Sequence, residues 1–190
     1  MNLRVKLRKN QSSFPSELFL EKELTSLEFI SEGIDSLPKE WSSLENLESL
    51  TLQVANVLNI PKEIFELPKL KILKIKNGCL KNLPKDLVPS KALQNLQLTN
   101  NKLIELPSWI GSIDQLEVLD LSGNSLEALP NSFKSLSRLK RLNLDRNEFQ
   151  HMPLELKELK SLLHLSLDNN KWLDEEKELI FKTFKIWFSS

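Results

Sequence analysis

The 190-residue sequence contains no tyrosine, a single cysteine, two histidines and four glycines. One thiol cannot build an internal disulfide framework or supply the thiolates that a structural zinc site needs. Four dispersed glycines provide no glycine-rich loop of the kind that cradles phosphates. The 26 basic and 26 acidic residues cancel, which argues against a nucleic-acid ligand held by a general basic surface. No apolar run approaches the ~20 residues of a membrane helix, so we expect no membrane span.

The sequence leaves the cellular location open. Residues 1–9 are basic, but no apolar stretch follows them, so we do not expect them to act as a secretion signal. A single cysteine fits a reducing compartment without requiring one. A cytoplasmic location and a secreted or surface location after removal of a signal both remain compatible with the chain.

Leucine is abundant and regularly placed, at 41 of the 190 positions. The prolines are regular too. Seven of the nine lie 23 residues apart, at Pro15, Pro38, Pro61, Pro84, Pro107, Pro130 and Pro153. Apolar residues keep the same period, and each unit begins with the spacing L-x-x-L-x-L, as in Leu116, Leu119 and Leu121. A fixed period of this length indicates a repeat protein whose units bury their leucines by stacking.

Each unit predicts one strand and one helical turn. The end of L-x-x-L-x-L alternates in polarity, as a short strand with one buried face does. The proline then turns the chain out of the strand layer, because its φ is fixed and it has no N–H to donate. Apolar residues at i and i+3 after it, such as Phe133 and Leu136, favour a helical or 3₁₀ turn. Parallel strands are expected near residues 26–29, 49–52, 72–75, 95–98, 118–121, 141–144 and 164–167.

The units that begin at Leu93, Leu116 and Leu139 follow the pattern L-x-x-L-x-L-x-x-N-x-L-x-x-L-P-x-x-I-x-x-L. This pattern resembles the leucine-rich repeat family, and it is similar to short bacterial members of the spirochaete type. The resemblance covers about residues 14–172. It implies an α/β solenoid, a curved right-handed coil with short parallel strands on its concave face and 3₁₀ or short helical turns on its convex face. It also implies that the chain binds a partner protein.

We expect a single domain over residues 1–190. Residues 1–23 form an N-terminal cap and partial repeat, residues 24–172 form seven repeats of which the last is partial, and residues 173–190 form a C-terminal cap. Near the N-terminus, Leu3 and Val5 alternate with polar residues as in a strand. The acidic start of residues 174–182 predicts a capping helix. The segment from Ile186 to Phe188 either extends that helix or returns as a final strand, and the similarity to spirochaete-type proteins favours the strand.

An asparagine column accompanies only the later units, at Asn101, Asn124, Asn147 and Asn170. A buried amide at this position can satisfy backbone groups between neighbouring coils. The earlier units carry Glu32, Ala55 and Gly78 instead, with Asn56 and Asn77 one residue away as substitutes. We therefore expect the first three coils to be less regular and easier to open than the last four.

Few side chains are available for chemistry, because the repeat uses nearly every position away from the surface and leaves no inserted loop for an active site. We therefore predict that the chain is not an enzyme and that it needs no cofactor and no metal. The alternative is a metal-dependent or catalytic protein that uses His164 with Asp145 and Asp168. No ligand motif of fixed spacing supports that alternative.

The polar residues of the strand stretches form the concave face, which is the predicted surface for a protein partner. Its C-terminal half carries mixed charge, and arginine suits recognition because its guanidinium makes paired hydrogen bonds to carboxylates. Alternatively, these charges only pair with one another across the strands. The candidate partner-binding residues are Asp120, Arg141, Asn143, Asp145, Arg146, His164 and Asp168, with Lys74 and Lys76 at the periphery.

Trp109 is the remaining candidate for partner binding, because it stands on the convex side in a column that earlier units fill with acids. An outward tryptophan suits an interface anchor, whereas one lying flat over its own coil is structural, and the sequence leaves both open. We expect a monomer that binds a protein and no nucleic acid. Self-association through Trp109, or through Trp187 and Phe188, is a further alternative.

Overall fold

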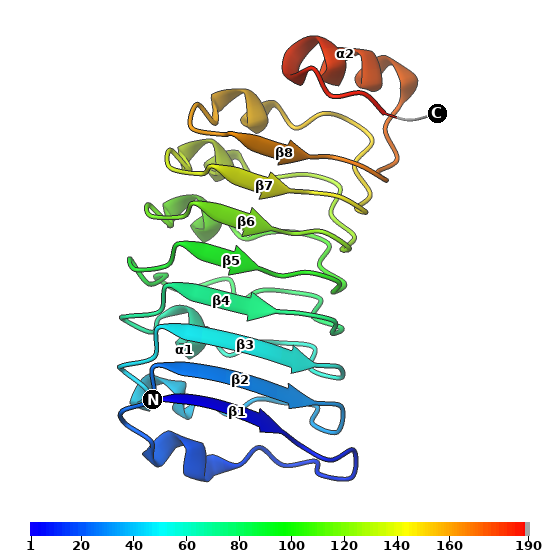
Figure 1. Cartoon of the computed structure of the whole chain (residues 1–190). Coiled ribbons are helices and arrows are strands. Elements are labelled where there is room, and N and C mark those ends of the chain that lie inside the picture. The colour runs from blue at the N-terminus through cyan, green and yellow to red at the C-terminus, as the bar shows by residue number, and fades with distance from the viewer. Residues whose placement is uncertain (189–190) are drawn as a thin grey trace.

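The computed structural model describes residues 1–188 as a stack of coils with one eight-stranded parallel sheet along its side (Figure 1). The strands follow one another in chain order, so each coil adds one strand beside the previous one. The predicted solenoid and its strand positions are confirmed. The strands are β1 (Asn2–Lys6), β2 (Ser26–Ser31), β3 (Ser49–Val54), β4 (Ile72–Ile75), β5 (Asn95–Gln97), β6 (Val118–Asp120), β7 (Arg141–Asn143) and β8 (His164–Ser166).

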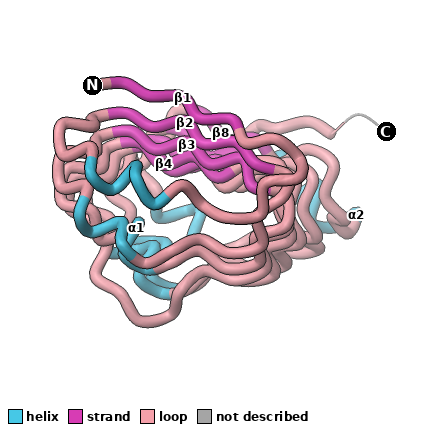
Figure 2. The backbone as a smooth tube through the Cα atoms, turned by 90° about the horizontal axis from the view of Figure 1, so that it is seen from below, coloured by secondary structure: helices cyan, strands magenta, loops and turns pink. Residues whose placement is uncertain are grey.

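Short helical turns cover the side opposite the strands, and Figure 2 shows the two layers separately. They are η1 (Ser16–Leu20), η2 (Glu40–Ser43), α1 (Lys62–Phe65), η3 (Ser108–Ser112), η4 (Asn131–Ser135) and η5 (Leu154–Glu158). Most of them begin directly after the repeated proline, whose fixed φ suits a helix start. The longer helix α2 (Asp174–Phe184) follows the last coil. Across residues 1–188, no helix has both the length and the apolar character to cross a bilayer.

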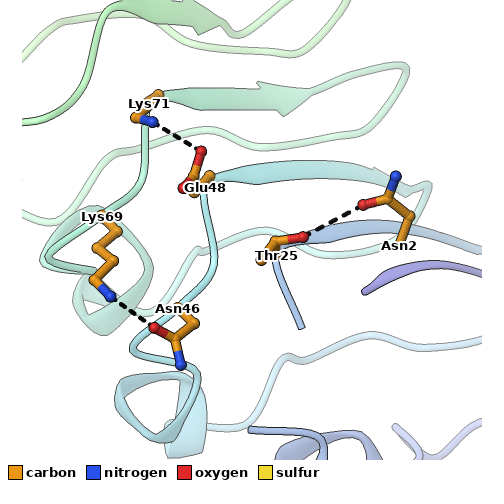
Figure 3. Close-up of polar contacts among 6 residues, drawn as sticks. All are labelled: Asn2, Thr25, Asn46, Glu48, Lys69 and Lys71. Atoms are coloured by element: carbon orange, nitrogen blue, oxygen red, sulfur yellow. Dashed lines mark hydrogen bonds and ion pairs between the residues drawn. The ribbon is translucent and has the colours of Figure 1, made fainter. Parts of the chain in front are cut away.

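Neighbouring coils from β2 to β8 pair residues 23 positions apart. Polar side chains just before the strands also bridge neighbouring coils, again between residues 23 positions apart. In Figure 3, Nζ of Lys71 donates to Glu48 at 2.8 Å, and Nζ of Lys69 donates to Oδ1 of Asn46 at 2.7 Å. The hydrogen bond from Lys71 holds the pKa of Glu48 below its usual range. Exposed pairs of this kind contribute little to stability, so the leucine columns set the register.

One continuous apolar core fills the interior. The inward residues of each strand belong to columns that run through all the coils, and Leu116, Leu119 and Leu121 are each at most 1% exposed. No single coil could hide them, because each coil covers only the face of its neighbour. The seven coils begin at Leu24, Leu47, Leu70, Leu93, Leu116, Leu139 and Leu162.

The asparagine column forms a ladder inside the later coils. The amide of Asn124 donates to the carbonyls of Leu98 at 2.7 Å and Leu121 at 2.8 Å, and it accepts from the N–H of Leu103 at 3.1 Å. Similar donor contacts recur at Asn101, Asn147 and Asn170. Each amide therefore ties its own coil to the preceding one through backbone groups.

The first three coils lack this ladder and are built differently. β2 and β3 pair over six residues, whereas each pair from β5 to β8 covers three. Asn56 donates one bond to the carbonyl of Glu32 at 2.7 Å, and Asn77 accepts one from Asn100 at 3.0 Å. Oδ1 of Asn101 is buried and has no hydrogen-bond partner in the part of the chain that is described. The ladder is therefore incomplete between the third and fourth coils, and the easier opening of the first three stays a prediction.

Trp109 faces inward, so of the two alternatives that the sequence left open the structure has the structural one and not the outward anchor. Between α1 and η3 the described chain has no helical turn, so the convex side of the third coil is thin. The indole of Trp109 fills this space, with its ring 5.1 Å from that of Phe65 and its Nε1 donating to the carbonyl of Pro84 at 2.7 Å. The side chain is only 6% exposed, so it packs the core and offers no interface anchor.

The N-terminal end is closed by β1 and an aromatic cluster. β1 confirms the strand predicted around Leu3 and Val5. Behind it, neighbouring ring centroids lie 4.7–5.5 Å apart in a cluster made by Phe14, Phe19, Phe29 and Trp41. These rings cover the open end of the first coil with apolar area.

The C-terminal end is closed by α2, which confirms the predicted capping helix. The predicted final strand is wrong. Lys185 takes a left-handed conformation with φ 60° that ends the helix, and residues 186–188 are irregular. Ile186 and Phe188 pack against the core, and the ring of Phe188 lies 6.3 Å from that of Trp172. Side-chain packing rather than backbone pairing anchors this segment, so among residues 1–188 β8 is the last strand of the sheet.

Glu176 ties α2 to the preceding coil. Its carboxylate accepts a hydrogen bond from the N–H of Met152 at 3.0 Å and lies 3.2 Å from Nδ1 of His151. These contacts, with the charge of Lys157 nearby, hold the pKa of Glu176 below its usual range. A carboxyl whose pKa is lowered by folding stabilises the fold above its unfolded-state pKa, and that stabilisation is lost as the pH falls through the folded value.

Glu176→Ala should lower the Tm at pH 7 by roughly 3–8 °C, because it removes a charged acceptor from a partly buried N–H. The difference from the wild type should shrink as the pH falls from the unfolded-state pKa of glutamate, about 4.3, through the lower folded-state pKa of Glu176. Thermal unfolding followed by circular dichroism measures both effects. Glu175→Ala removes the same charge from an exposed side chain and is the control. Equal losses in the two variants would show that Glu176 does not tie down the cap.

Candidate functional site

A hollow of about 610 Å³ crosses strands β6 to β8 and continues over the edge of β8 to the last coil and the end of α2. This volume is in the range of roughly 300–1,000 Å³ that ligand pockets occupy. We call it the β8 groove. Its polar lining includes four of the predicted binding residues, Asp120, Arg141, Asn143 and His164. Its apolar lining includes Leu162, Leu163, Leu165, Phe184 and Ile186.

Strand pairing brings the polar residues of the groove together. Val118, Arg141 and His164 stand opposite one another on three adjacent strands, and Asp120 and Asn143 belong to the next row. Because side chains alternate along a strand, the leucine between the two rows points into the core while both rows face outward. The repeat thus converts positions 23 residues apart into one continuous surface.

The acidic side chains near the groove are engaged locally. Oδ1 of Asp120 accepts hydrogen bonds from the N–H and the hydroxyl of Ser122, at 3.0 and 2.7 Å. Oδ1 of Asp145 accepts from the hydroxyl of Ser166 and the N–H of Asp168, both at 2.7 Å. These carboxylates hold the backbone that follows the strands, as short acidic side chains do in turns.

The arginines carry no ion pair. Among residues 1–188, no carboxylate oxygen lies within 4.0 Å of the guanidinium nitrogens of Arg141 or Arg146, and both side chains are exposed. The alternative in which the concave charges only pair with one another therefore fails for these two residues. Two exposed guanidinium groups can make paired hydrogen bonds to carboxylates of another molecule.

Arg146 has a backbone conformation that its residue type disfavours. Its φ is 54°, and the same column in other coils holds Asn77, Asn100, Gly123 and Asn169 at φ of 53–69°. Glycine and asparagine enter this left-handed region readily, whereas other residues lose roughly 1–2 kcal/mol there. Strained residues of this kind concentrate at functional sites, which favours a role for Arg146 outside folding.

Arg146→Asn should raise the Tm by about 2–4 °C, because asparagine relieves roughly 1 kcal/mol of backbone strain. The reciprocal change Asn169→Arg introduces the same strain one coil later and should lower the Tm by a similar amount. Differential scanning calorimetry measures both. A lower Tm for Arg146→Asn would mean that the arginine side chain stabilises the fold.

The other candidates lie outside the β8 groove. Lys74 is on β4, two strands from β6, and Lys76 follows it, and both are half-buried. Asp145, Arg146 and Asp168 follow the ends of β7 and β8. The structure thus gathers four candidates into one hollow and leaves the other three C-terminal candidates and both lysines outside it.

The metal alternative finds no support in the structure. Within residues 1–188 there is no group of three or more His, Cys, Asp or Glu side chains placed to hold a metal ion. Asp145, one of its proposed ligands, is already bound by Ser166 and by the backbone of Asp168. His164 instead lines the groove as an exposed ring.

Sequence reasoning missed the apolar half of the groove. Leu163 is 73% exposed in a column that the other coils fill with polar residues, Thr25, Glu48, Lys71, Gln94, Glu117 and Lys140. This break in polarity is visible in the sequence and could have identified the site. Phe184 and Ile186 give no such signal, because their place depends on the turn at Lys185.

The family model described as "Leucine-rich repeat region" matches residues 85–182, just over half of the chain. The chain belongs to the leucine-rich repeat family. A second family model, described as "Leucine rich repeat", matches residues 45–103 of this leucine-rich repeat chain. Among curated proteins, no sequence matches it significantly.

Solved leucine-rich repeat structures share the fold. The Leptospira interrogans protein LIC12759 is 28% identical with a TM-score of 0.64, over 94% of this chain and 57% of that one, which agrees with the predicted bacterial resemblance. The PEPR1–AtPEP1 structure is 26% identical with a TM-score of 0.79, over 98% of this chain and 28% of that one. The TLR13–ssRNA13 complex is 23% identical with a TM-score of 0.78, over 94% of this chain and 26% of that one, and this likeness shows only that the fold is shared. The chain spans 57% or less of the length of each of these three proteins.

Proposed function

We propose that this leucine-rich repeat chain is a non-catalytic recognition module that binds a protein partner with the C-terminal half of its concave face. The observation that carries the proposal is the β8 groove, where an apolar hollow adjoins the exposed guanidinium of Arg141. Arginine is enriched among the residues that dominate binding energy, especially beside a pocket that excludes water. The similar PEPR1–AtPEP1 structure, which pairs a repeat protein with a second molecule, supports a binding role.

The asparagine ladder supports the same half of the face. Asn147 of this ladder fixes the coil that carries Arg141 and Arg146 to the preceding coil through buried hydrogen bonds. Side chains on a rigid support lose less freedom when a partner docks, so more of the contact energy appears as affinity.

Arg141→Glu combined with Arg146→Glu should weaken partner binding at least tenfold, about 1.4 kcal/mol, while leaving the Tm unchanged. The partner is first captured from cell extracts on the immobilised wild-type protein and then measured by biolayer interferometry. Lys39→Glu with Lys62→Glu makes the same charge change on the convex side and should alter the affinity less than twofold. If the convex pair abolishes binding and the concave pair does not, the proposed face is wrong.

Self-association is the second candidate function. Trp187 is 76% exposed beside the half-buried Phe188, at the C-terminal end of the solenoid. Static light scattering over a concentration series measures it. A mass that stays at 22.0 kDa for the single chain would exclude this second candidate.

A further inference from the structure

Each strand of the later coils presents backbone groups to the next strand. The carbonyl of Lys140 accepts hydrogen bonds from the N–H groups of Leu163 and His164, at 2.8 and 3.0 Å. The N–H of Leu144 donates to the carbonyl of Ser166 at 2.9 Å. These contacts join β7 to β8, and the repeat places the same two groups on every coil.

The equivalent groups flank β8, and they are the carbonyl of Leu163 and the N–H of Leu167. Leu167 is 0% exposed, so of the two only the carbonyl of Leu163 is open to another molecule. Neither makes a backbone hydrogen bond within the described part of the chain, where β8 is the last strand of the sheet. An open strand edge of this kind is a template for pairing with another extended chain.

The β8 groove adjoins this open edge and extends the apolar columns of the core. Leu162 and Leu165 are half-buried where their counterparts in the inner coils are fully covered, and Leu163 is largely exposed. Phe184 and Ile186 also line the groove, from the segment that follows the last coil. The space therefore suits the inward side chains of one more strand.

The charge of the groove identifies the kind of strand that fits. Arg141, Lys157 and His164 line it, and Asp120 is its one acidic side chain, with Oδ1 already bound by Ser122. In residues 1–188, neither Arg141 nor Lys157 has a carboxylate within 4.0 Å. Cations that have no close carboxylate, placed around an apolar slot, are complementary to a segment that carries carboxylates.

We propose that the β8 groove binds an extended acidic segment of a partner protein, which adds to the sheet as a ninth parallel strand. The proposal rests on the proposed function and specifies how the partner is held. The main chain of the segment pairs with β8 at the carbonyl of the exposed Leu163, at the start of the strand. Its apolar side chains pack on Leu165, while its outward side chains lie in the row of His164 and Arg141 and in the next row, that of Ser166 and Asn143.

Two end-blocked fluorescent peptides test the charge preference by anisotropy. The first, LQELDLS, keeps the L-x-x-L-x-L spacing and has acids at both outward positions, and the second, LQKLKLS, has lysines there. The wild-type protein should bind the acidic peptide at least tenfold more tightly. Arg141→Glu should reduce this preference at least tenfold.

Backbone pairing is tested on the same acidic peptide. N-methylation of its glutamate removes an N–H that would donate to the carbonyl of Leu163 and should weaken binding at least tenfold. Leu163→Lys should weaken binding to a similar extent. Leu20→Lys changes an equally exposed leucine, 77% accessible at the other end of the solenoid, and should bind the peptide like the wild type.

Three results would overturn the proposal. The first is no binding of the acidic peptide at about 1 mM, or no preference over the lysine peptide. The second is sensitivity to Arg141→Glu without any effect of N-methylation or Leu163→Lys, in which case concave-face recognition stands and strand addition fails. The third is a dimer in light scattering that Leu163→Lys dissociates, because a second copy would then occupy the groove. Failure of the proposed function would give a different result. The variant with Arg141→Glu and Arg146→Glu would then capture the partner as well as the wild type does.

Discussion

Replacing Leu119 with alanine should lower the free energy of unfolding by about 2–5 kcal/mol. Leu119 is 1% exposed in the fifth coil, and it pairs with Leu96 on one side and Leu142 on the other. The hydrogen-bonded strands on both sides prevent the coils from closing around the missing methyl groups. The cavity should therefore persist, which favours the upper half of that range.

Urea unfolding followed by circular dichroism measures the loss for Leu119→Ala. Leu20→Ala removes the same atoms from an exposed side chain on η1 and should cost less than about 0.5 kcal/mol. If the two variants lose equal stability, the leucine columns do not supply the cohesion between coils, and the register of the sheet needs another explanation.

Asn124→Ala should cost about 3–5 kcal/mol, although it removes few atoms. The substitution leaves the carbonyls of Leu98 and Leu121 and the N–H of Leu103 buried without their side-chain partner. Each unsatisfied buried group costs roughly 1–3 kcal/mol, and little water can reach them between stacked coils. The loss should therefore match that of a truncated core leucine.

Asn124→Asp distinguishes hydrogen bonding from volume. A carboxylate has nearly the shape of the amide but cannot donate to the two carbonyls, so this variant should be at least as unstable as Asn124→Ala at pH 7. Asn82→Ala, on the exposed convex side, is the control and should stay within about 0.5 kcal/mol of the wild type. Full stability of Asn124→Asp would mean that the ladder contributes by packing alone.

The period of 23 residues was sufficient to predict the strands, the turns after the prolines and the buried leucine columns. All of these depend on contacts between equivalent positions, which a repeat places side by side. Trp109 could not be placed in this way, because its position depends on the missing helical turn of the third coil. The course of residues 186–188 depends on the left-handed turn at Lys185 and on packing against Trp172, which no column of the repeat encodes.

The candidate site, too, could be predicted from the repeat only in part. The repeat predicts that Arg141 and His164 stand side by side, and the structure places them opposite each other on β7 and β8. It does not predict that Asp120 and Asp145 are bound by neighbouring hydroxyl and N–H groups, since those contacts depend on the bends after the strands. Nearby opposite charges alone would predict ion pairs between these aspartates and Arg141 or Arg146, and such pairs do not form among residues 1–188.

The position of Trp109 constrains how the repeat array can change in length. In an ideal solenoid each coil touches only its two neighbours, so a unit can be lost or duplicated without disturbing the rest. Trp109, in the fourth coil, reaches past the third to contact Phe65 in the second. Deletion of the third coil would force these two rings into adjacent coils, and duplication of that coil would separate them by another turn. Recombination between repeats is therefore expected to be tolerated on either side of this contact and not across it.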